Sequence, residues 1–146
     1  MKIRFYCYWL QGEESSGNDY YLRRNSLLID APESIAQGFN KYLLSALGSD
    51  FPAHHPEDCD EVLANIDKFE RGELLTYGTG GLGFDHSFTR EKVTFEHSIF
   101  GECPEWPLWS CTLAQYKAAL QGWRKFIDMP KSIDTELIVD LPDGTP

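Results

Sequence analysis

The sequence predicts an α+β domain, built mostly on antiparallel sheet with about three helices. Segments in which every second residue is apolar, as in strands, occur in clusters, and three longer segments carry apolar residues at helical spacing. The chain has 146 residues, of which 42% are hydrophobic. This length and composition suit a single domain with one core. We therefore expect one domain over residues 1–146, with a frayed tail at 142–146.

The first fifty residues are expected to form a hairpin followed by a helix. Apolar residues alternate over 3–10, the stretch 11–19 is polar, and a second strand is predicted over 20–29. Pro32, with acids on either side, gives a helix-start signal. The apolar stripe of this helix comprises Ile35, Phe39, Leu43 and Leu47. Gly48 is expected to end the helix.

A second helix is predicted over 56–71. Acidic residues crowd its first turn and basic residues its last, which is the arrangement that the helix dipole favours. Gly72 is expected to close it. Its buried face comprises Cys59, Val62, Leu63, Ile66 and Phe69. A short strand is then expected over 73–77.

The remaining elements follow from alternation and from one capping signal. Residues 84–88 and 93–99 alternate as a hairpin would, and a further short strand is expected at 108–111. Thr112 and Gln115 are spaced as a capping box and predict a helix that runs to about Asp128. Its apolar face comprises Leu113, Tyr116, Leu120, Trp123 and Ile127. A last strand is expected at 137–141.

The segment between the second helix and the first of these strands contains the spacing Gly78-x-Gly80-x-x-Gly83. This is the spacing of a dinucleotide-binding loop, which requires a helix directly after the glycines to hold the pyrophosphate. Here an alternating, strand-like stretch follows instead, and no Gly-Lys-Ser/Thr occurs. We therefore interpret the glycines as a turn, a bulge or a strand crossing, and we expect no cofactor.

Two further groups of residues suggest chemistry. Asp85 and His86, facing Glu96 across the hairpin, could act as a carboxylate-oriented base, which leaves a small enzyme as the alternative function. Neighbours in a strand point to opposite faces, however, and His86 lies on the apolar face, where a hydrogen-bonded core histidine is expected. His54 and His55 lack the second spaced pair that a metal site needs, so we expect no metal.

The charge of the chain restricts its partners. Its formal net charge is −10, from 23 Asp and Glu residues against 13 Lys and Arg. Such a charge repels nucleic acid and anionic membranes and attracts basic partners over a distance. No apolar run reaches the length of a signal sequence or a membrane span, and the four cysteines suit a reducing compartment. We therefore expect a cytoplasmic protein with no nucleic-acid or membrane partner.

One acidic stretch is a candidate docking surface for a basic protein. Residues 50–61 contain five acids and no Lys or Arg. A solvated loop and a helix N-terminal turn are the commoner explanation of such a composition. Acidic rims speed association, and aromatic residues beside them supply affinity. The predicted partner-binding residues are Asp50, Phe51, Glu57, Asp58, Asp60, Glu61, Tyr20 and Tyr21.

A longer segment resembles a known class of protein. The stretch GFDHSFTREKVTFEHSIF, followed by LWSCTLAQYKAALQGWRKFIDMP, is similar to bacterial immunity proteins of polymorphic toxin systems, including those of contact-dependent growth inhibition. The resemblance covers about a third of the chain. It implies a protein that is not an enzyme and that neutralises a cognate toxin C-terminal domain, often a basic nuclease, by masking its active site. A general adaptor domain remains a further alternative.

Overall fold

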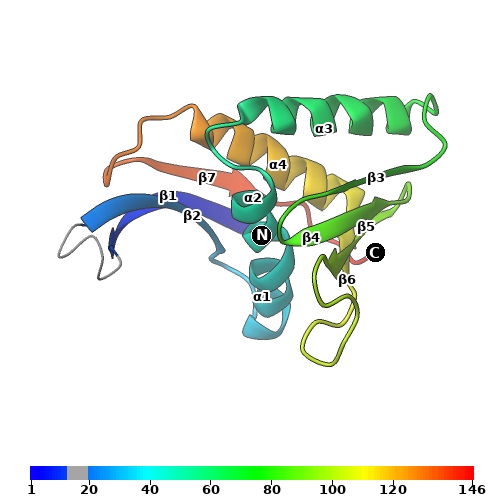
Figure 1. Ribbon diagram of the computed structural model, residues 1–146, viewed down its shortest axis with the longest axis horizontal. Helices are drawn as coiled ribbons and strands as arrows, with labels where there is room; N and C mark the ends of the chain where they lie inside the picture. Colours follow the sequence, from blue (N-terminus) through cyan, green and yellow to red (C-terminus); the bar gives the residue numbers. More distant parts are fainter. Residues whose placement is uncertain (13–19) are drawn as a thin grey trace.

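The computed structural model describes residues 1–12 and 20–146, which form two antiparallel sheets and three helical segments (Figure 1). One sheet has the order β2-β1-β7 and is made of β1 (Lys2–Gln11), β2 (Tyr20–Leu28) and β7 (Glu136–Asp140). The other has the order β3-β4-β5-β6 and is made of β3 (Tyr77–Gly80), β4 (Phe84–Phe88), β5 (Lys92–His97) and β6 (Trp109–Thr112). The predicted α+β class, with mostly antiparallel sheet, is confirmed.

The hairpin of β1 and β2 forms as its alternation predicts. Ile3, Phe5 and Cys7 are buried on the face that packs against the core. Trp9 continues the alternation but is 55% exposed, because the outer end of β1 extends beyond the helices that cover the sheet (Figure 1). Most of the polar stretch expected between the two strands lies outside the described residues.

The first helical segment is continuous but irregular. It consists of α1 (Glu33–Phe39), the π-turn η2 (Asn40–Leu44) and α2 (Ser45–Asp50). Gly48 does not end it, because this glycine keeps a helical backbone and the segment runs on to Asp50. Ile35 is 45% exposed rather than part of the buried stripe, since α1 projects past the sheets (Figure 1).

The two later helices pack against each other. α3 (Pro56–Glu70) is closed by Gly72, whose φ of 79° is the left-handed conformation that glycine tolerates. α4 (Leu113–Ile127) begins with the predicted capping box between Thr112 and Gln115. α4 joins the two sheets, because Trp123 packs on Phe5 of β1 while Tyr116 packs on β4 and β5. Within the described residues, no helix is both long and apolar enough to cross a membrane.

The glycine segment forms an edge strand and a tight turn. Gly78 and Gly80 lie within β3, so the strand comes later than the predicted 73–77. A Cβ atom added to Gly81 would lie 2.5 Å from Oδ1 of Asp50, and one added to Gly83 would collide with Ser49. The glycines therefore allow the end of α2 to approach the backbone of this turn.

The chain ends meet beside β1. The backbone N–H of Leu141 donates to the carbonyl of Met1 at 2.7 Å. In the expected tail, 142–146, the side chains are exposed, but the carbonyls of Pro142 and Gly144 accept hydrogen bonds from the buried amide of Gln115. Gln115 thus serves both the helix cap and the last residues of the chain.

Two thiols are buried between the helices and the second sheet. Burial raises the pKa of Cys59 from 9.0 to about 12, and it also raises the pKa of Cys111. A group whose folded pKa is raised stabilises the fold below its unfolded pKa, and this contribution is lost as the pH rises through the folded pKa.

We therefore expect the free energy of unfolding to fall by roughly 1–2 kcal/mol for each thiol between pH 8 and pH 10. Urea unfolding of the wild type and of Cys59→Ala at both pH values measures this loss, because other ionisations cancel in the comparison. The variant should show a smaller decrease. An equal decrease in both proteins would contradict a raised thiol pKa.

Candidate functional site

A small groove lies between the first half of α3 and the edge strand β3. Its volume is about 330 Å³. We call it the acidic groove, because Asp50, Asp58 and Glu61 are among its lining residues and no Lys or Arg is. The opposite wall is β3, where Tyr77 and Thr79 alternate with two glycines. A lining of this kind suits a positively charged group.

Asp58 and Glu61 carry the charge of the groove. They are three positions apart on α3 and so lie on one helical face. No ion pair among the described residues involves either of them, whereas Asp60 pairs with Arg124 at 2.8 Å. Burial raises the pKa of Tyr77 in the opposite wall, and the negative charge of Glu61 adds to this increase. The two carboxylates therefore present a local negative potential to solvent.

Beneath the groove, a buried chain of hydrogen bonds connects α2 to α4 through β4. Nε2 of His86 lies 2.7 Å from Oδ2 of Asp50, and Nδ1 of His86 lies 2.8 Å from the hydroxyl oxygen of Tyr116. Burial holds the pKa of Tyr116 well above its usual value, so the hydroxyl keeps its proton and can donate to Nδ1. The other carboxylate oxygen of Asp50 accepts the N–H of Gly83 at 2.7 Å.

The three residues considered for an enzyme, His86, Asp85 and Glu96, lie on two different faces of the sheet. His86 is 1% exposed and forms the core hydrogen bonds expected of its apolar face. Asp85 and Glu96 are opposite each other across β4 and β5, and both are exposed on the other face of the sheet. The three residues therefore do not converge on one site.

The predicted docking residues do not form one surface. Asp50 and Phe51 are turned inward, since the side chain of Asp50 is 2% exposed and Phe51 is 3% exposed. Phe51 packs against His86 and cannot act as a surface anchor in this conformation. The four predicted docking acids on α3 are not buried, and they are Glu57, Asp58, Asp60 and Glu61. Tyr20 and Tyr21 are exposed at the start of β2, away from the acidic groove.

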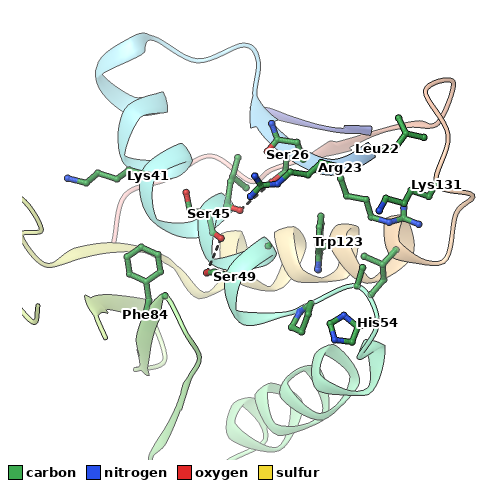
Figure 2. Close-up of a pocket in the computed structure, with 18 of the residues that line it drawn as sticks. Leu22, Arg23, Ser26, Lys41, Ser45, Ser49, His54, Phe84, Trp123 and Lys131 are labelled. Carbon is green, nitrogen blue, oxygen red and sulfur yellow. Dashed lines mark hydrogen bonds between the residues drawn. The ribbon is translucent and has the colours of Figure 1, made fainter. Parts of the chain in front are cut away.

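A larger cleft with the opposite charge lies between three elements. They are β2, the η2 and α2 parts of the first helical segment, and the C-terminal half of α4. Its volume is about 930 Å³ (Figure 2). We call it the basic cleft, because its lining contains four Lys or Arg residues and no Asp or Glu. These residues are Arg23, Arg24, Lys41 and Lys131. They come from three distant parts of the chain, so only the adjacent pair Arg23 and Arg24 is visible as a cluster in the sequence.

The structure also bears on the metal site considered for His54 and His55. Within the described residues, no group of three or more His, Cys, Asp or Glu side chains is arranged to hold a metal ion. The ring centres of His54 and His55 lie 4.3 Å apart with the rings tilted by 49°, and the nearby Cys59 is fully buried. Protein-family models, curated proteins and solved structures were all compared with the chain, and none of them matches it.

Proposed function

We propose that this protein is a cytoplasmic immunity protein, which binds the basic C-terminal domain of a cognate toxin and masks its active site. The observation that carries the proposal is the acidic groove, where two carboxylates without an ion-pair partner in the described structure flank a recess. The resemblance of about residues 84–130 to immunity proteins supports the same function.

The geometry suggests how such a partner would be held. The groove has the volume of roughly ten water molecules, which is room for a basic side chain to enter between α3 and β3. Asp58 and Glu61 would accept its charge-assisted hydrogen bonds at the rim. α3 lies at the outside of the molecule (Figure 1), and its other acids are exposed and would steer the partner during approach.

Masking requires no bond to be made or broken. A nuclease active site is positively charged because it binds phosphates, and an acidic surface that fills it excludes the substrate. The protein would therefore act in a 1:1 complex, with affinity that falls as salt is added. The direct test is coexpression with the toxin domain encoded by the adjacent upstream gene. Absence of both binding and protection of the cell would remove the proposal.

Charge reversal in the groove is expected to slow association. We expect the double variant Asp58→Lys, Glu61→Lys to associate roughly tenfold more slowly with that toxin domain and to show a weaker dependence on salt. Stopped-flow or surface-based kinetics at several salt concentrations measure both quantities.

The matched control changes the same charge elsewhere. Glu91 and Glu102 are exposed and lie outside the groove. Their replacement by lysine gives the same net charge as the groove variant, and it should leave most of the association rate intact. Equal slowing in the two double variants would mean that net charge alone, and not the groove, controls docking.

A further inference from the structure

We propose that the basic cleft is a second binding site, which holds an extended acidic segment of a partner protein along the free edge of β2. This site goes beyond the proposed function, because it lies apart from the acidic groove and takes a ligand of opposite charge. The proposal is supported by the charge of the cleft, by the backbone groups of β2 that point away from β1, and by the open space beside Gly48.

The charge of the cleft is opposite to that of the whole protein. The chain has 23 acidic and 13 basic residues, yet the lining holds four basic residues and no acidic one. Figure 2 shows Arg23 and Lys131 toward one end of the cleft and Lys41 toward the other. Negative charge along the length of a ligand would therefore be matched at both ends.

Two of the cations are held in place by the fold. Arg24 donates to the carbonyls of Phe126 and Met129, at 3.0 and 2.9 Å, at the end of α4. Lys41 donates to the carbonyl of Glu105, and its ammonium group lies 4.4 Å from the ring centre of Trp106. These side chains lose little conformational freedom when a ligand binds, which favours affinity.

The cleft follows the edge of a strand. β2 is the outermost strand of its sheet, and six consecutive residues, 21–26, line the cleft. The N–H of Ile29 donates to Lys2 of β1, whereas the N–H of Leu28 points away from β1 and donates to Asn40. Because these directions alternate along a strand, Leu22 and Arg24 turn their backbone groups toward the cleft.

An open strand edge is a template for a further strand. Near Leu28 the edge of β2 is closed, because the side chain of Asn40 accepts the N–H of Leu28. At Ser26, the side-chain hydroxyl donates to the carbonyl of Leu44. No described residue closes the backbone edge at Leu22 and Arg24 in this way. A partner segment could therefore pair there by β-augmentation, over a span of about 17 Å for five residues.

The cations of the cleft define the side chains of the segment. The cations line the cleft together with Trp123 and Ile127 of α4, whose side chains are largely buried. In an added strand, successive side chains point to opposite sides. The side chains of the segment that face the cations should therefore be acidic.

Gly48 allows the cleft to be blocked without disturbing the fold. It lines the cleft, and a Cβ atom added to it meets no other atom within 4 Å. Gly48→Tyr should therefore fill part of the cleft, whereas Gly48→Ala leaves it open and raises helix propensity. Thermal unfolding of both variants verifies that the fold is kept.

The test selects random ten-residue peptides, displayed on phage, on the wild-type protein. We expect the selected peptides to be enriched in Asp and Glu. The best peptide should bind Gly48→Tyr and the double variant Arg23→Glu, Lys131→Glu at least tenfold more weakly than wild type, and Gly48→Ala within twofold. Methylation of backbone nitrogens that face β2 should also weaken it at least tenfold.

Other outcomes would overturn the proposal. Selected peptides without an excess of acidic residues, or with equal affinity for Gly48→Tyr, would exclude an acidic segment in the cleft. If citrate binds with the same dependence on Gly48, and backbone methylation has no effect, the cleft is a site for small anions. The variant Asp58→Lys, Glu61→Lys should bind the peptide at least as well as wild type, so this test is independent of the toxin partner.

Discussion

Replacement of Asp50 by alanine is expected to lower the free energy of unfolding by about 3–5 kcal/mol. The carboxylate accepts hydrogen bonds from His86 and from the N–H of Gly83, and the side chains of the Asp50–His86 pair are 2% and 0% exposed. Alanine leaves both donors without their acceptor beneath the acidic groove. Urea unfolding followed by tryptophan fluorescence measures the loss.

Two companion variants identify the cause. Asp50→Asn should cost much less, because its amide can donate to Nε2 of His86 once the ring proton sits on Nδ1, where the oxygen of Tyr116 accepts it. Asp85 precedes His86 in β4 and is exposed on the other face of the sheet. Asp85→Ala should therefore change the free energy of unfolding by no more than about 0.5 kcal/mol. A cost below about 1 kcal/mol for Asp50→Ala would mean that the pair contributes no more than a typical exposed ion pair.

Substitution of alanine for Gly81 is expected to be the second most damaging change, at about 2–3 kcal/mol. The added Cβ would lie 2.5 Å from Oδ1 and 2.6 Å from Cβ of Asp50. The Cβ of Asp50 is fixed to the backbone of α2, so the contact can be relieved only by moving the end of that helix or the turn itself. The same unfolding measurement applies, and an unchanged midpoint would exclude the close approach.

The control is a glycine in open space. Gly48→Ala should stabilise the protein by about 0.5–1 kcal/mol, because alanine favours the helix and meets no neighbour. The double variant Gly81→Ala, Asp50→Ala should cost less than the sum of the two single changes, since removing the carboxylate removes part of the collision.

The local elements could be predicted because each depends on nearby residues. Alternation over 84–88 and 93–99 predicted a hairpin, which forms as β4 and β5 although β5 ends at His97, and the Thr112–Gln115 capping box determines where α4 begins. Gly48 misled the prediction because a glycine ends a helix only when it takes a left-handed conformation, which depends on what the following residues pack against.

The candidate site was less predictable because its contacts join distant residues. Asp50 and His86 are 36 positions apart, so nothing near Asp50 indicates that its carboxylate is buried. Phe51 beside an acid is compatible with a surface anchor or with the core, and only its contact with His86 decides for the core. The basic cleft was missed because cations from residues 23, 41 and 131 meet only after the strands have paired.

The position of β7 affects how the chain can fold while it is being synthesised. β1 is the central strand of its sheet, and its second neighbour, β7, comprises residues 136–140. A nascent chain that has not reached this segment leaves one side of β1 unpaired, open to strand addition by other nascent chains. β7 must therefore emerge from the ribosome before both edges of β1 can be paired.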